Sequence, residues 1–397
     1  MKVLVCNAGS TSLKFKLFNM PQEQVLAESR VERVGSRYAA SFHYNNPQNG
    51  YSVTLDKQDI PTYAEGIRLF LTYLLGWGSK AVDTIDELER VGFKTVLAKG
   101  FYGIHELTSE VLAAMETYLV VAPAHNGPYL EAIRQFQGIV PQAKLIGAFE
   151  TAFHTTIPLE RRLYGVPYEW YETHGVQRLG YHGASHSYIA DTITSLYGGT
   201  GRLISCHLGG SGSVCAILDG KSVDTSFGFS LQTGLLHASR SGDVDVYLIP
   251  FLLSKGMSME DILFGMEKNG GMLGISGISN DLRDLEEIMH TNPRAKLAID
   301  VFCNGIIKYI GAFYAELGGL DHLVFTGGIG ENSPVVRSFV CSPLTHMGVL
   351  LDSDANIQKP SDKPLPPRII STGASHAHVH VIAANEELGV ARKTYQY

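Results

Sequence analysis

The first twenty or so residues predict two strands joined by a turn. Residues 2–6 (KVLVC) are mostly apolar, residues 8–12 are small, and residues 13–18 (LKFKLF) alternate apolar with polar side chains. Alternation with a period of two is typical of a half-buried strand. This part of the chain therefore predicts a strand, a glycine-containing turn and a second strand.

The same design returns near the middle of the chain. Residues 203–208 (LISCHL) and 214–218 (VCAIL) are apolar, and the glycine-rich segment 209–213 (GGSGS) separates them. Asp219 and Gly220 follow, a dipeptide that favours a tight hairpin turn. Two copies of one design predict a duplicated architecture.

Helical patterns lie between and after these copies. Residues 63–75 carry apolar side chains at roughly helical spacing, and residues 109–119 begin at Ser109 as a candidate cap. Near the end, residues 379–384 predict a strand and residues 385–392 (NEELGVAR) a closing helix with an acidic start. The chain therefore mixes strands and helices, which predicts an α/β fold.

A third glycine segment follows the predicted strand 322–326 (HLVFT). Residues 327–330 read GGIG, and Ser333 and Pro334 then suit the N-cap and the first position of a helix. Strand, glycine loop and helix follow one another here.

Composition narrows the class of protein. A chain of 397 residues suggests two or three domains, because a domain usually has about 100 to 200 residues. Apolar residues make up 45% and charged residues 18%, which is typical of a soluble globular protein. The formal net charge is −7 and no run is rich in Lys or Arg, so we expect no nucleic-acid partner.

The cysteines and apolar runs indicate a soluble, cytoplasmic protein. The five cysteines are odd in number and form no C-x-x-C pair, which favours buried, reduced thiols. The longest apolar stretch, residues 246–253, contains Pro250 and is too short to span a membrane. We expect no membrane partner and no export.

The glycine loops favour phosphate binding when they are taken together. Glycine at a strand turn lets backbone N–H groups approach phosphate oxygens, although a single such loop is more often only a turn. Gly209–Ser213 lacks the third glycine of a dinucleotide fingerprint, and Cys215 stands where a P-loop ending at Ser222 needs its first glycine. The remaining option is two phosphate-binding hairpins that face each other across a cleft, plus a nucleotide loop at a helix N-terminus. That arrangement is typical of the actin-like ATPase fold.

Eight segments resemble the acetate and propionate kinases. In chain order they are Asn7–Phe15 (NAGSTSLKF), Ala122–Asn126 (APAHN), Thr151–His154 (TAFH), Tyr181–His186 (YHGASH), Cys206–Gly209 (CHLG), Gly277–Asp284 (GISNDLRD), Gly327–Asn332 (GGIGEN) and Asn385–Leu388 (NEEL). They cover nearly the whole chain in the family's order.

The resemblance implies the fold and the partners. It implies two actin-like (ribonuclease H-like) domains with a nucleotide cleft between them, one of residues 1–150 completed by a C-terminal helix over 385–397, the other of residues 151–384. The second domain would carry the nucleotide loops and the surface of a homodimer. The implied activity is reversible, ATP- and Mg²⁺-dependent phosphorylation of a short-chain carboxylate such as acetate or propionate to an acyl phosphate, in organic acid metabolism.

The resemblance also assigns roles to individual residues. Asn7 and Glu386 would bind Mg²⁺; Glu150, His182 and Arg240 would be catalytic; and Lys94, Val96, Ala124, His125, Tyr181 and Leu231 would bind the acid. ATP or ADP would be held by Ser10, Ser12, Lys14, His207, Leu208, Gly209, Gly210, Ser211, Asp281, Leu282, Arg283, Gly328, Ile329, Gly330, Glu331 and Asn332. Donors and cations around a transferring phosphoryl group, together with a metal, supply most of the catalysis in such reactions.

Three of these positions depart from the family pattern. Lys94 follows Phe93 where the family has arginine after histidine, and a lysine cannot offer two parallel N–H donors to a carboxylate. Glu150 replaces the family's aspartate, and Gly210 replaces an asparagine of the phosphate loop, for which Ser211 is a candidate substitute. The charges at Lys94 and Glu150 survive, so the two changes are either a compensating pair or drift in a weakened enzyme.

For two groups of histidines, a structural role is a simpler interpretation than a metal site. His182 and His186 stand four apart, but no third metal ligand is evident nearby, so we expect His186 to cap or pack. His376, His378 and His380 alternate, which places them on one face of a strand, and we expect that face to be solvated or part of an interface.

Three functions remain open. The leading hypothesis is an active carboxylate kinase, with a pocket that Ala124 widens towards acids longer than acetate. The second is a catalytically impaired ATP-binding member of the family. The third is a kinase for another acceptor such as a hydroxyl group, for which Glu150 would be the general base.

Overall fold

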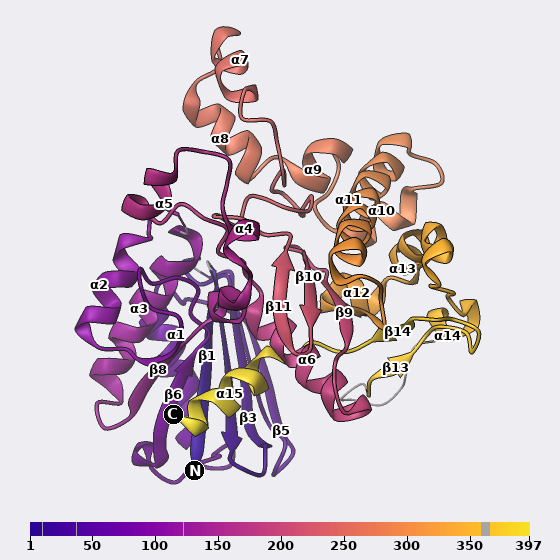
Figure 1. Ribbon diagram of the computed structural model, residues 1–397. Helices are drawn as coiled ribbons and strands as arrows, with labels where there is room; N and C mark the ends of the chain where they lie inside the picture. The colour runs from indigo at the N-terminus through magenta and orange to yellow at the C-terminus, as the bar shows by residue number, and fades with distance from the viewer. Residues whose placement is uncertain (10, 37, 122, 359–365) are drawn as a thin grey trace. The chain divides into compact units, whose positions relative to one another are not determined.

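The computed structural model describes residues 1–9, 11–36, 38–121, 123–358 and 366–397. The chain divides into two compact units. Unit 1 consists of Met1–Ala152 and Asn385–Tyr397, and unit 2 of Phe153–Ala384. Both are mixed α/β, as the alternation of strand and helix patterns predicts (Figure 1).

Unit 1 is built on an eight-stranded sheet with the order β5-β4-β3-β2-β1-β6-β8-β7. Its strands are β1 Lys2–Gly9, β2 Ser12–Asn19, β3 Gln24–Glu32, β4 Ala40–Asn46, β5 Tyr51–Gln58, β6 Leu88–Phe93, β7 Gly103–Glu106 and β8 Lys144–Phe149. Its helices are α1 Tyr63–Leu75, α2 Ser109–Thr117, α3 Pro123–Ile139 and α15 Glu386–Gln396, with a 3₁₀ turn at Ile85–Glu87. A second 3₁₀ segment, Glu150–Thr156, leads into unit 2.

Helices cover both faces of this sheet. On one face Phe15 of β2 stacks on Phe70 of α1 and meets Phe136 of α3 edge to face. On the other face α15 packs against β1, β6 and β8, with Val390 and Ala391 buried against Val3 and Val5. A Cβ atom at Gly92 of β6 would lie 2.2 Å from the Thr394 hydroxyl, so only glycine lets α15 approach this closely.

Unit 2 is built on a six-stranded sheet with the order β11-β10-β9-β12-β14-β13. Its strands are β9 Arg202–His207, β10 Ser213–Leu218, β11 Lys221–Thr225, β12 His322–Thr326, β13 Arg368–Ile369 and β14 His378–Val381. Its helices are α4 Leu159–Arg162, α5 Tyr168–His174, α6 Gly183–Tyr197, α7 Leu248–Ser254, α8 Met259–Glu267, α9 Gly271–Ser276, α10 Leu282–Ile288, α11 Pro293–Leu317, α12 Gly327–Asn332, α13 Pro334–Cys341 and α14 Ser353–Ile357, with a 3₁₀ segment at Ser342–Met347.

The two units share one strand arrangement. In each, three consecutive strands pair antiparallel and two further strands continue the sheet in parallel, as β3-β2-β1-β6-β8 in unit 1 and β11-β10-β9-β12-β14 in unit 2. The predicted duplication is therefore confirmed at the level of topology. The predicted hairpin turn is also present, because Asp219 and Gly220 both have positive φ, at 48° and 81°.

The core of unit 2 lies on both faces of its sheet. Alternate residues of β9 and β10 face either α11 or α6, so Ile204 and Val214 are buried with α11 and Leu203 and Ile217 with α6. Helix α11 is long and apolar enough to cross a membrane by length and composition, but it contacts β9 and β10 and contributes nine buried residues to this core. It is the central helix of unit 2.

Three local predictions were wrong in detail. The cap of α2 is Thr108, whose hydroxyl accepts from the Val111 N–H, and not Ser109. Strand β14 ends at Val381 and does not continue to residue 384, because the chain leaves the sheet there. The Glu331 carboxylate accepts a hydrogen bond from the Ala384 N–H. His376 and His378 are exposed as predicted, but His380 is buried with an exposed fraction of 1% and shares a 3.2 Å hydrogen bond with His322.

Candidate active site

In unit 1, predicted site residues gather at the carboxyl ends of β1, β6 and β8. These strands are parallel neighbours; Asn7 lies near the end of β1, and Lys94 and Glu150 directly follow the last residues of β6 and β8. The Lys94 N–H donates to the Cys6 carbonyl at 3.3 Å, and the Glu150 N–H donates to the Thr95 carbonyl at 3.1 Å. Ligands of open α/β sheets bind at this edge, so the strand order itself brings the three residues together.

Lys94 forms ion pairs with two carboxylates in this cluster. Its Nζ lies 2.6 Å from Glu386 Oε2 and 3.3 Å from Glu150 Oε1, and all three side chains are at most 14% exposed. Glu386 reaches the cluster because Asn385 caps α15 and places it in the first helical turn. The predicted metal ligand Glu386 and the predicted substrate ligand Lys94 therefore bind each other.

Burial and charge shift the pKa values of this cluster. Burial raises the pKa of Glu150 to about 7, while Lys94 lowers it, Glu386 raises it and Lys393 lowers it. Burial lowers the pKa of Lys94, but the Glu150 and Glu386 carboxylates outweigh burial and hold it well above its usual value. Lys94 is therefore a permanent cation whose charge the two carboxylates share.

Tyr129 is a member of the cluster that the sequence did not indicate. Its hydroxyl donates to Asn7 Oδ1 at 2.9 Å, and burial raises its pKa well above the usual value. The bond orients the Asn7 amide and leaves its oxygen one lone pair for another partner. The only hint in the sequence is that Tyr129 follows the APAHN segment.

The other predicted residues of unit 1 lie around this edge. Lys14 pairs with Asn7 across the β1–β2 ladder and is exposed, while Ser12 begins β2. Val96 is buried, with an exposed fraction of 3%. Ser10 and the side chains of Ala124 and His125 lie outside the described part of the chain.

The donors of the cluster fit a magnesium ion. Asn7 and the carboxylates of Glu386 and Glu150 are hard oxygen ligands, which Mg²⁺ prefers, and Mg²⁺ usually takes one or two carboxylates and completes its shell with phosphates and water. Within the described ranges, no three His, Cys, Asp or Glu side chains are grouped so that they could hold a metal by themselves. Phosphate oxygens or water molecules would complete the shell of such an ion.

In unit 2, a histidine network surrounds the glycine-rich turn between β9 and β10. His182 Nδ1 and His186 Nε2 each share a 2.9 Å hydrogen bond with Ser213 Oγ, and His207 Nδ1 shares one of 2.8 Å with Ser185. His182 is the N-cap of α6 with φ of 57°, a left-handed conformation that aims its ring at this turn. Sequence reasoning found His182 and His207 but missed Ser213, although it closes the GGSGS segment.

The turn itself combines open space with an unsatisfied hydroxyl. Gly210 is exposed, and its carbonyl accepts from the Ala238 N–H at 2.9 Å. Among the described residues the buried Ser211 Oγ has no hydrogen-bond partner. The Gly212 N–H donates to His237 Nδ1 at 3.1 Å, which fixes the far end of the turn.

Arg240 and Tyr181 lie near each other on the same side of unit 2. Burial lowers the pKa of Arg240 to about 10, while Glu267 and Tyr181 raise it. Tyr181 is fully buried and its hydroxyl donates to the Phe229 carbonyl at 2.6 Å. Leu231 is buried two residues further along, with an exposed fraction of 9%. Arg240 thus remains cationic at neutral pH in a partly desolvated position.

The third glycine segment forms a short helix, α12, at the end of β12. The Leu208 carbonyl accepts from the Ile329 N–H at 2.8 Å and from the Gly330 N–H at 3.2 Å. Gly327 has φ of 78°, and a Cβ there would lie 2.7 Å from the same carbonyl oxygen. The ends of β9 and β12 are therefore tied together, and two N–H groups of this segment are already used within the protein.

The remaining predicted nucleotide residues lie on α12 and α10. Asn332 donates to the Gly328 carbonyl at 2.8 Å, and Glu331 accepts the Ala384 N–H at 2.9 Å. Asp281 caps α10 and pairs with Arg283 at 2.5 Å, and the Arg283 side chain is 85% exposed. Leu282 is buried in the core.

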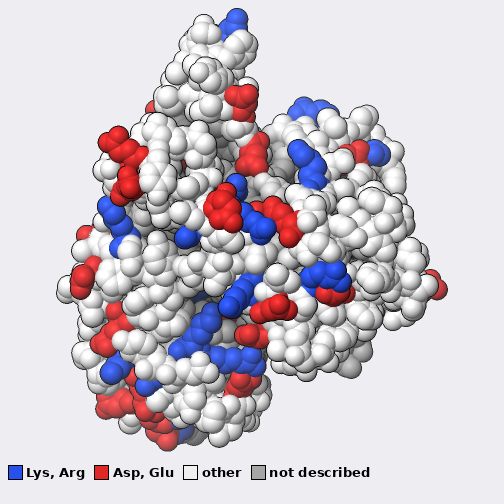
Figure 2. All heavy atoms as spheres, in the orientation of Figure 1, with Lys and Arg blue, Asp and Glu red and all other residues white. Residues whose placement is uncertain are grey.

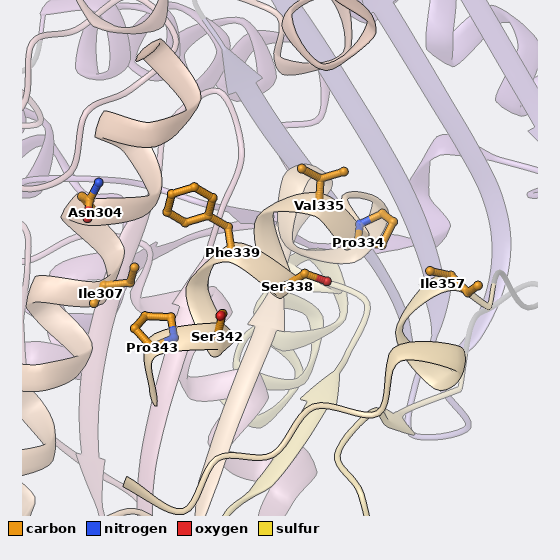
Figure 3. A pocket seen from close by; sticks show the side chains of 9 residues that line it. All are labelled: Asn304, Ile307, Pro334, Val335, Ser338, Phe339, Ser342, Pro343 and Ile357. Atoms are coloured by element: carbon orange, nitrogen blue, oxygen red, sulfur yellow. The ribbon is translucent and has the colours of Figure 1, made fainter. Parts of the chain in front are cut away.

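A separate pocket of about 800 Å³ contains none of the predicted residues (Figure 3). It lies between α11, α13, the segment Ser342–Met347 and the end of α14. Its lining is Asn304, Ile307, Pro334, Val335, Ser338, Phe339, Ser342, Pro343 and Ile357. The predicted residues instead lie in unit 1 around the carboxyl ends of β1, β6 and β8, and in unit 2 around the glycine-rich turn and on α12 and α10.

Comparison with known proteins gives one consistent result. The sequence profile described as the acetokinase family matches residues 2–392. The acetate kinase of Geobacillus kaustophilus is 41% identical over 397 residues, which is 98% of this chain and 98% of that protein.

Solved structures agree with the sequence relatives. The acetate kinase of Porphyromonas gingivalis has a TM-score of 0.88 at 35% identity, and a propionate kinase of Francisella tularensis subsp. tularensis SCHU S4 has 0.90 at 29%. Each comparison covers 100% of this chain and 99% of the other. The predicted fold class is confirmed by these matches.

Proposed function

The chain belongs to the acetokinase family, and from this premise we propose that it phosphorylates a short-chain carboxylate with ATP to give an acyl phosphate and ADP. The observation that carries the proposal is the pair of residue groups, one in each unit. One supplies oxygen ligands and a lysine, and the other supplies His182, Arg240 and the glycine-rich turn.

The reaction requires these residues to stabilise negative charge and does not require them to remove a proton. A carboxylic acid is ionised at neutral pH, so it attacks the γ-phosphorus without a general base. Arg240 and His182 would meet the negative charge that spreads over the phosphoryl oxygens in the transition state. Mg²⁺, when bound through Asn7 and Glu386, would neutralise part of the nucleotide's charge.

The altered phosphate turn has a candidate donor. Gly210 offers no side chain where the family has asparagine, but the Ser211 hydroxyl lacks a hydrogen-bond partner among the described residues. We propose that Ser211 donates to a phosphoryl oxygen. Ser211→Ala should then lower kcat on the order of a hundredfold, as for the loss of an oxyanion donor.

Hydroxylamine trapping of acyl phosphate tests the function directly. The full chain is incubated with ATP, Mg²⁺ and each acid from acetate to valerate, and hydroxamate formation is followed with ADP release. We expect product with acetate or propionate. ATP binding without any hydroxamate would instead indicate an impaired member of the family, and ADP release that depends on a hydroxyl compound would indicate another acceptor.

We also propose a cytoplasmic homodimer formed through α7 and α8. This helical hairpin exposes the apolar side chains Val246, Tyr247, Leu248, Phe251, Leu253, Met257, Met259, Leu263 and Phe264. Figure 2 shows it almost free of charged side chains on the visible face. Exposed apolar patches of this kind mark association surfaces. Light scattering should give twice the chain mass, and Phe251→Asp should give monomers.

A further inference from the structure

Lys94 differs from an ordinary substrate-binding lysine, because its ammonium already binds two carboxylates of the protein. Nζ lies 2.6 Å from Glu386 and 3.3 Å from Glu150, in a position where neither carboxylate is more than 14% exposed. One ammonium thus faces two acidic groups. An anionic acid approaching this cluster would meet an ammonium group whose charge is already shared between two carboxylates.

The side chain of Lys94 can change partners while its backbone stays fixed. The Lys94 N–H is bonded to the Cys6 carbonyl at the end of β6, which anchors the main chain. Lysine carries a compact charge on a flexible four-carbon stem, unlike the planar fork of arginine. Movement of the ammonium between neighbouring carboxylates therefore needs no change in the sheet.

A divalent cation at Glu386 would compete directly with this ammonium. Two cations within a few ångströms repel each other strongly in a partly buried site. A divalent cation would also change the net charge of Lys94, Glu150 and Glu386 from negative to positive. The net charge with the cation is positive whether or not Glu150 is protonated.

We infer that Lys94 is a metal-gated counter-ion: its ammonium neutralises Glu386 and Glu150 when no divalent cation is bound, and it would turn to the carboxylate of the acid when Glu386 and Asn7 hold a cation. This inference rests on the proposed function. If Lys94 acts in this way, the metal ion has to bind before the acid.

Metal affinity is the first test. Free Mn²⁺ is measured by electron paramagnetic resonance while it is titrated into the full chain without nucleotide. Lys94→Met should bind Mn²⁺ at least about tenfold more tightly than the wild type, because the competing charge is gone. Lys16→Met is the matched control, since Lys16 pairs with Glu28 at 3.3 Å on the same sheet, away from the cluster. Circular dichroism checks that each variant is folded.

Acid binding is the second test. Relaxation of ¹³C-acetate and ¹³C-propionate is measured with ADP, in the presence and absence of Mg²⁺. Wild type should bind the acid at least about tenfold more tightly with Mg²⁺, and Lys94→Met should bind weakly in both cases. Unchanged Mn²⁺ affinity in Lys94→Met, or metal-independent acid binding in the wild type, would overturn the inference. Neither readout needs turnover, so both remain informative if the hydroxylamine assay yields no product.

Discussion

Acidification should destabilise unit 2 through its buried neutral histidines. Burial lowers the pKa of His154 to about 4, and of His237 and His380 to about 3, and all three are at most 1% exposed. In the unfolded chain each would have a pKa of about 6.5. The unfolded state therefore binds more protons below that pH, and stability falls as the pH falls.

The magnitude follows from the difference in proton binding. At pH 5 each of these histidines is almost fully protonated when unfolded and neutral when folded, which costs about 2 kcal/mol per residue relative to pH 8. Three residues give about 6 kcal/mol, within the range of the whole stability of a domain. Glu316 opposes this, because burial raises its pKa to about 7 and its contribution grows on acidification. The histidines outweigh it.

The assay uses the two tryptophans, Trp77 and Trp170, which lie in different units. In a Trp77→Phe background, urea unfolding followed by Trp170 fluorescence reports on unit 2 between pH 8 and pH 5. His380→Asn should lose about 2 kcal/mol less than its parent over this range, whatever its stability at pH 8. His346→Gln, which changes an exposed histidine, should follow the parent. Equal pH dependence in His380→Asn and the parent would show that burial of a neutral His380 does not make unit 2 sensitive to acid.

Three further changes test the strand ends. Tyr129→Phe removes the donor to Asn7, and loss of about 1 kcal/mol should raise the Mg²⁺ concentration for half-maximal activity about fivefold in a metal titration. Gly327→Ala places a Cβ 2.7 Å from the Leu208 oxygen at a positive φ, and should lower stability by about 1–3 kcal/mol in urea unfolding. Arg337→Met removes a buried guanidinium that donates to the Gly330 and Glu331 carbonyls of α12. The free energy of unfolding should fall by about 3 kcal/mol or more, and the KM for ATP should rise. An unchanged KM would show that α12 does not take part in nucleotide binding.

Much of the fold could be predicted from local patterns. The runs at 2–6 and 13–18, their copies at 203–208 and 214–218, and the helix at 63–75 all correspond to observed elements. Such patterns report the period of burial and the turns that only certain residues allow, which are local properties. The Ser333-Pro334 helix start was correct for the same reason.

The contacts between side chains of the site come from tertiary packing. Glu386 pairs with Lys94 across 292 positions of sequence because α15 returns to the sheet of unit 1, and no local pattern encodes that contact. Tyr129 joins the cluster through the packing of α3 on β1, and His380 is buried because His322 lies beside it on β12. Local sequence patterns specify where the strands end and which residue types stand there. Parallel pairing of strands that are distant in the sequence determines which of these residues lie side by side, and therefore which charges the site contains.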